Sequence, residues 1–105
     1  MVEPLVDEIA RKIVAAFHPR RIVMFGSRAR GDARPDSDLD LMVEMESADP
    51  PAQRVRALLA LFGLRRWAMD VVVFTPQEVV EQRRYRNSLI RVIEAEGRVL
   101  YVQPG

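Results

Sequence analysis

The feature that most restricts the fold is an apolar run at residues 68–74, which reads Ala-Met-Asp-Val-Val-Val-Phe. Its length and β-branched content are typical of a strand, and a strand that is apolar on both sides needs cover on both faces of its sheet. Asp70 is the only charged residue in this run. The run therefore predicts a sheet flanked by helices, and it marks Asp70 as a residue that core packing does not explain.

The rest of the chain alternates between helical and strand patterns. Helical spacing of apolar residues predicts one helix over residues 4–17 and another from Val55 to Phe62, with Asp49 as its cap. Thr75-Pro76-Gln77-Glu78 is a capping box, which predicts the start of a further helix. With strands at 21–25, 38–43 and 98–102 and a last helix closed by Gly97, we expect an α/β fold. It should be a single domain spanning residues 1–105, with a mixed sheet of about four strands and flanking helices.

Residues 26–43 join a small-residue turn to a strand with two different faces. Gly26-Ser27 interrupts the apolar run that precedes it, so a tight turn is expected there. Beyond the turn, aliphatic residues alternate with polar ones at the period of a strand. The aliphatic side carries Leu39, Leu41 and Val43, and the other carries Asp38, Asp40 and Met42.

The two aspartates suggest a cation site. Residues two apart on a strand point the same way, about 6.6 to 7 Å apart along the backbone. Carboxylates so placed repel one another unless a positive charge lies between them, and Mg²⁺ is a cation that carboxylates and substrate phosphates bind together. The competing interpretation is an exposed edge strand with acidic gatekeepers. It explains neither the Gly-Ser turn upstream nor Asp70, so we favour the cation site.

The turn offers a complementary site for phosphate. Glycine lets a phosphate approach the backbone closely, and the Ser27 hydroxyl and nearby N–H groups can donate to it. Arg28 directly follows the Gly-Ser pair and is the better candidate for a phosphate clamp, with Arg30 as a weaker one. The alternative is that these arginines only balance the acidic residues around them.

The sequence resembles the signature of the polymerase-beta-like nucleotidyltransferase superfamily, with the pair Gly26-Ser27 followed after ten residues by Asp38-Leu39-Asp40. The short chain looks like the minimal branch of that superfamily. The resemblance implies that Gly26, Ser27 and Arg28 bind the nucleotide phosphates. It also implies that Asp38, Asp40 and Asp70 are catalytic and hold two Mg²⁺ ions. The reaction it implies is transfer of a nucleoside monophosphate, most simply AMP from ATP, with Asp70 accepting the proton of the acceptor hydroxyl.

The resemblance also suggests a partner. Longer relatives carry an additional acceptor-binding lobe, so this chain is expected to borrow a surface from a second copy of itself or from another protein. Minimal nucleotidyltransferases commonly act as antitoxins beside a HEPN-domain ribonuclease, transferring AMP to a tyrosine hydroxyl. The alternatives are a regulatory subunit that binds nucleotide or partner without turnover, and a transferase acting on a small molecule such as an aminoglycoside.

Composition sets the remaining limits. Sixteen basic and fifteen acidic side chains give a formal charge of +1, so direct nucleic-acid binding is not expected. The sequence contains no cysteine, which excludes disulfides and thiolate metal sites. With neither a signal peptide nor an apolar run long enough to cross a bilayer, the expected compartment is the cytoplasm.

Overall fold

The fold was analysed from a computed structural model, which describes residues 4–32, 38–65 and 67–104. The described residues form an α/β structure, as the sequence predicts. The elements in chain order are α1 (Pro4–Phe17), β1 (Arg21–Phe25), α2 (Ser27–Arg30), β2 (Leu39–Glu44), α3 (Pro51–Leu59), β3 (Met69–Phe74), α4 (Pro76–Arg83), α5 (Leu89–Glu96) and β4 (Arg98–Val102). The expectation of a single domain over residues 1–105 remains a prediction.

The four strands form one mixed sheet in the order β3-β2-β1-β4. Strand β1 is central and pairs antiparallel with both β2 and β4. Strands β2 and β3 are parallel. The crossover between them, which contains α3, returns the chain to the end of the sheet where β2 begins. The parallel pairing matters for function, since it places the beginnings of β2 and β3 side by side.

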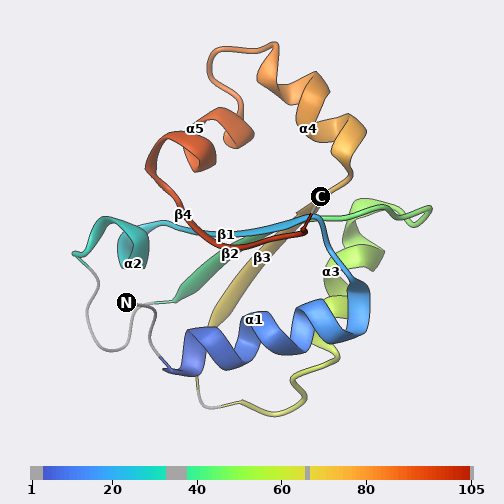
Figure 1. Cartoon of the computed structure of the whole chain (residues 1–105), viewed down its shortest axis with the longest axis vertical. Helices are drawn as coiled ribbons and strands as arrows, with labels where there is room; N and C mark the ends of the chain where they lie inside the picture. The colour runs from blue at the N-terminus through green and yellow to red at the C-terminus, as the bar shows by residue number, and fades with distance from the viewer. Residues whose placement is uncertain (1–3, 33–37, 66, 105) are drawn as a thin grey trace.

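Helices cover both faces of the sheet, as the apolar run in β3 predicts. Helices α1 and α3 lie on one side and α4 and α5 on the other (Figure 1). Val71 and Val73 of β3 belong to the core under α1 and α3, whereas Val72 packs against the core under α4 and α5. Met42 of β2 is fully buried in that second core. On the side of β2 that carries Asp40, Met42 is thus the apolar residue between Asp40 at the start of the strand and Glu44 at its end.

Local sequence signals account for most helix ends. At the start of α4, the Glu78 N–H donates to the Thr75 hydroxyl at 3.2 Å and the Thr75 N–H donates to the Glu78 carboxylate at 2.8 Å, which confirms the predicted capping box. The expected start of α3 is wrong, because its N-cap is Pro50 and not Asp49. Helix α3 also ends at Leu59, so Phe62 reaches the core from the turn that follows.

Arg54 on α3 is the only charged residue in the described chain with a buried side chain. Its guanidinium donates to the Asp49 carbonyl at 2.7 Å, to the Val73 carbonyl at 3.3 Å and to the Glu78 carboxylate at 2.7 Å. Burial alone would raise the pKa of Glu78, but the hydrogen bonds from Arg54 and Thr75 outweigh it and lower that pKa. The hydrogen bonds of Arg54 thus link α3 and β3 to the first turn of α4.

Candidate active site

The Gly-Ser turn closes β1 and starts a single helical turn. The Ala29 and Arg30 N–H groups both donate to the Gly26 carbonyl at 3.1 Å, and Ala29 is buried beneath the turn. Gly31 ends the turn with a φ of 85°. The tight turn expected at Gly26-Ser27 is confirmed, and it continues as one turn of helix.

Gly26 is the position where no side chain can be accommodated. Its φ is 75°, which L side chains rarely adopt, and a β-carbon there would collide with Oδ2 of Asp40 and lie 3.1 Å from Cγ. The contact arises from strand register, because Phe25 is the pairing partner of Asp40 across β1 and β2. The carboxylate of Asp40 therefore lies directly against the backbone of the turn.

Asp40 and Asp70 are register partners in the parallel pair β2–β3. Partners in adjacent strands point to the same face, so the two carboxylates neighbour one another although they come from distant parts of the sequence. Asp38 precedes β2 and is exposed, as is Asp70, whereas Asp40 is half-buried. All three lie at the end of the sheet where β2 and β3 begin.

The charges of Asp38 and Asp70 both act on Asp40. Burial raises the pKa of the Asp40 carboxyl, and the charges of Asp70 and Asp38 raise it further. The charge of Arg30 opposes the shift and lowers that pKa. The structure thus brings into the site an arginine that sequence reasoning ranked below Arg28.

Arg30 is held by two long contacts from opposite sides. Its guanidinium lies 3.5 Å from Oδ2 of Asp32 and 3.4 Å from Oε1 of Glu96, at the end of α5. The Glu96 contact could not be foreseen, because no short motif links α2 to α5. Arg28 lies half-buried on the same turn.

The donor chemistry fits a hard divalent cation. Asp38, Asp40 and Asp70 supply only carboxylate oxygens, which are the ligands that Mg²⁺ prefers. Among the described residues, no three acidic, histidine or cysteine side chains are gathered closely enough to make a finished metal site.

The family follows from comparison with known proteins. The sequence profile of the family described as "Nucleotidyltransferase domain" matches residues 6–104, nearly the whole chain. This chain belongs to the nucleotidyltransferase domain family. The prediction made from Gly26-Ser27 and Asp38-Leu39-Asp40 is thereby confirmed at the level of the family.

Solved structures show the same fold for this nucleotidyltransferase domain. A candidate nucleotidyltransferase from Sulfolobus solfataricus superimposes with a TM-score of 0.65 at 20% identity, covering 94% of this chain and 78% of that one. A toxin–antitoxin crystal structure with AMP-PNP superimposes with a TM-score of 0.55 at 19% identity, covering 91% and 73% respectively. No functionally curated protein matches the sequence. None of the described helices is long and apolar enough to span a bilayer.

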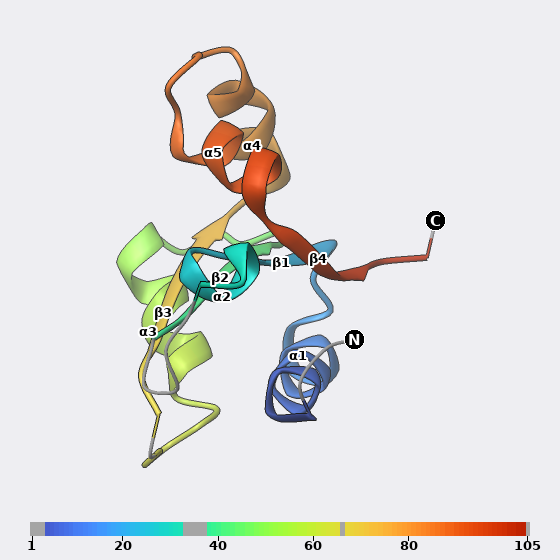
Figure 2. The same ribbon diagram turned by 90° about the vertical axis from the view of Figure 1, so that its left-hand side faces the viewer.

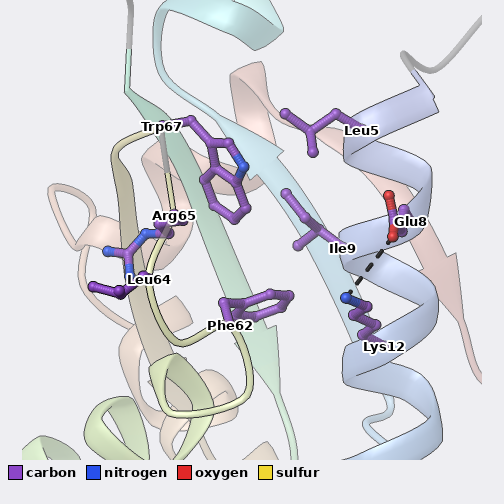
Figure 3. Close-up of a pocket in the computed structure, with 8 residues that line it drawn as sticks. All are labelled: Leu5, Glu8, Ile9, Lys12, Phe62, Leu64, Arg65 and Trp67. Atoms are coloured by element: carbon purple, nitrogen blue, oxygen red, sulfur yellow. Dashed lines mark ion pairs between the residues drawn. The ribbon is translucent and has the colours of Figure 1, made fainter.

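A separate hollow of about 370 Å³ lies between α1 and the segment that leads into β3. There Trp67 meets Phe62 edge-on, with ring centroids 5.9 Å apart, and the guanidinium of Arg65 lies 5.6 Å from the centroid of Trp67 (Figure 3). Phe62 and Trp67 also pack against the core under α1 and α3. Asp70 points to the opposite face of β3, so this hollow is distinct from the nucleotidyltransferase site.

Proposed function

We propose that this nucleotidyltransferase domain transfers a nucleoside monophosphate, most simply AMP from ATP, to a hydroxyl group of a partner protein. The observation that carries the proposal is the meeting of Asp40 with both the Gly26 turn and Asp70. A phosphate seated on that turn would lie beside the carboxylates, which is the juxtaposition that metal-assisted phosphoryl chemistry needs.

Each residue then has a distinct role. Gly26 keeps the turn open to phosphate, the Ser27 hydroxyl donates to it, and Arg28 adds positive charge on the same turn. Asp38, Asp40 and Asp70 would hold two Mg²⁺ ions, which when bound neutralise charge on the triphosphate and the departing pyrophosphate. Asp70 is exposed at the start of β3 and is the residue we assign to accept the proton of the acceptor hydroxyl.

The proposed acceptor is a HEPN-domain toxin, with this chain as its antitoxin. The support is the resemblance carried by the sequence motifs, together with the fold shared with a chain of a toxin–antitoxin structure that contains AMP-PNP. All three carboxylates of the motif are present, which favours turnover over the alternative of a regulatory subunit that only binds nucleotide.

The test is incubation of the protein with ATP labelled at the α-phosphate, Mg²⁺ and a HEPN-domain partner encoded beside it. We expect label on the partner, and we expect Asp38→Asn or Asp40→Asn to abolish it. Glu46→Gln is the matched control, since Glu46 is an exposed carboxylate beyond the other end of β2 and is not assigned to the site. Nucleotide binding with no labelled protein would instead support the regulatory subunit, and label on an aminoglycoside would support the small-molecule transferase.

A further inference from the structure

The two edges of the sheet differ in how they are protected. Strand β3 forms one edge, where α3 packs against it and Arg54 donates to the Val73 carbonyl. Strand β4 forms the other edge, and in the described part of the chain no strand pairs with its outer side. Its pairing with β1 shifts register between Ile22 and Val23, so Leu100 lies opposite no residue of β1. Val99 and Val102 of β4 are 55% and 59% exposed. An open edge that carries exposed valines is a template for pairing with another strand.

Helix α1 extends this open edge into a broader surface. Figure 2 shows β4 and α1 on one flank of the molecule, with β3 and α3 on the other. Between α1 and the middle of β4 lies a hollow of about 300 Å³, lined chiefly by aliphatic and small side chains. Its lining residues are Asp7, Ala10, Arg11, Val14, Ala15, Leu100 and Tyr101. Alanines at this flank leave room for a second helix to approach closely.

The charged residues on this flank can pair with the same residues of a second copy of the chain. Asp7 and Arg11 form an ion pair of 2.9 Å along α1, with 49% and 80% of their side chains exposed. In a two-fold contact the partner helix runs in the opposite direction, so Asp7 faces Arg11 of the other copy and Arg11 faces its Asp7. The hollow places this charged stretch beside Leu100 and Tyr101 of β4, so the strand and the helix contribute to one surface.

We propose that β4 and α1 form the interface of a symmetric homodimer, in which the β4 strands of two copies pair antiparallel into one continuous sheet. The α1 helices then lie side by side on the same face, with the aliphatic hollows turned toward one another. The self-complementary charges select a second copy over an unrelated extended segment. The active site, near the Gly26 turn, does not enter this inference, so its failure would leave the proposed function intact.

The experiment is sedimentation equilibrium of the purified chain over about 1 to 300 μM, with variants of the proposed interface. Val99→Lys places a charge at the open edge and should leave a monomer with an unchanged circular dichroism spectrum. Asp7→Arg and Arg11→Glu each turn the α1 contact repulsive, and each should raise the dimer dissociation constant about tenfold or more, since symmetry counts every contact twice. The double variant Asp7→Arg/Arg11→Glu restores the complementarity and should recover the dimer.

The neighbouring ion pair on α1 supplies the control. Lys12 lies 3.8 Å from Glu8 and lines the hollow beside Trp67 instead of the one beside β4, so Lys12→Glu should leave dimerisation unchanged. A wild-type chain that stays monomeric to the highest concentration would overturn the proposal. So would a dimer that Val99→Lys and Arg11→Glu leave intact, or a double variant that fails to recover it.

Discussion

The carboxylate of Asp40 occupies the space that a β-carbon at residue 26 would need. Strand register fixes this relationship, because Asp40 pairs with the residue that precedes Gly26. Glycine is therefore required twice at this position, once for its positive φ and once for the close approach of Asp40. The Gly26 turn and the Asp40 carboxylate therefore form a single packed unit.

The variant Gly26→Ala should lose transfer activity by at least about a hundredfold and lower the free energy of unfolding by about 2 to 3 kcal/mol, through backbone strain and the displacement of Asp40. Gly31→Ala is the matched control, since Gly31 also has a positive φ but has nothing within 4 Å of a β-carbon. Gly31→Ala should lower the free energy of unfolding by only about 1 kcal/mol. Equal losses in chemical denaturation would contradict the packing argument.

Neutralising Asp40 should remove activity and yet stabilise the fold. Burial and the charges of Asp70 and Asp38 disfavour its ionised form, so the folded state is strained by that charge at neutral pH. Asp40→Asn should raise Tm by about 2 to 4 °C in the absence of divalent cations. Glu46→Gln, which changes an exposed carboxylate beyond the other end of β2, should leave Tm within about 1 °C. A lower Tm for Asp40→Asn would show that the carboxylate is well compensated after all.

Divalent cations should stabilise the wild-type chain. A cation that binds only the folded state raises its stability as concentration exceeds the dissociation constant, by about 2.7 kcal/mol at a hundredfold excess. Differential scanning fluorimetry with added Mg²⁺, reversed by EDTA, should therefore show a rise in Tm. The rise should vanish in Asp38→Asn and Asp40→Asn. An equal rise in wild type and variants would place cation binding elsewhere.

Stability should fall in acid partly through Glu94. Hydrogen bonds from Arg83, assisted by Arg21 and opposed by burial, lower the pKa of the Glu94 carboxyl below its ordinary value of 4.5. A folded pKa below the unfolded one contributes stability that is present above about pH 4.5 and disappears as pH falls through the folded value. Glu94→Gln should cost about 2 kcal/mol at pH 7, and that deficit should shrink below pH 4.5.

Urea denaturation of wild type and Glu94→Gln between pH 7 and pH 3 measures this difference. Glu81→Gln provides the comparison, because Glu81 pairs with Arg84 at 3.2 Å with both side chains more than half exposed. It should change stability by less than about 0.5 kcal/mol at any pH. A deficit for Glu94→Gln that stays constant into acid would mean that its charge is not what stabilises the fold.

Removal of Glu78 should destabilise the junction of α3, β3 and α4. Its carboxylate accepts hydrogen bonds from the Thr75 N–H and from the buried guanidinium of Arg54. Glu78→Ala should therefore lower the free energy of unfolding by about 2 to 3 kcal/mol. Glu78→Gln can keep both acceptor contacts and should lose less. Thermal unfolding distinguishes the two, and similar losses would indicate that charge outweighs hydrogen bonding here.

The sequence predicted those elements whose signals are local. The four strands, the turn at Ser27, the capping box at Thr75 and the cover on both faces of β3 all follow from short-range patterns. The start of α3 was misjudged because Asp49 is a favourable cap, whereas Pro50 takes that place and the Asp49 carbonyl is used by Arg54. Propensity cannot weigh a contact made by a buried side chain five residues further on.

The site was predictable in its residue types but not in its couplings. Alternation along a strand suggests that Asp38 and Asp40 share a side, yet only the register of β2 with β3 shows that Asp40 and Asp70 are direct partners. Likewise, Arg28 was the better candidate for a phosphate clamp because it directly follows Gly26-Ser27. The effect of Arg30 on the pKa of Asp40 depends instead on their distance in the folded structure. Contacts between distant segments are what a single sequence leaves undetermined.

The parallel pairing of β2 with β3 also bears on the order of assembly. Antiparallel neighbours can meet through a short hairpin, but parallel ones meet only after an intervening crossover has wrapped around. A nascent chain that ends before Met69 would carry the glycine bend and the first two acids with nothing to align the third. Catalytic competence would then be acquired in one step, when the crossover through α3 closes, and could not accumulate piece by piece during synthesis.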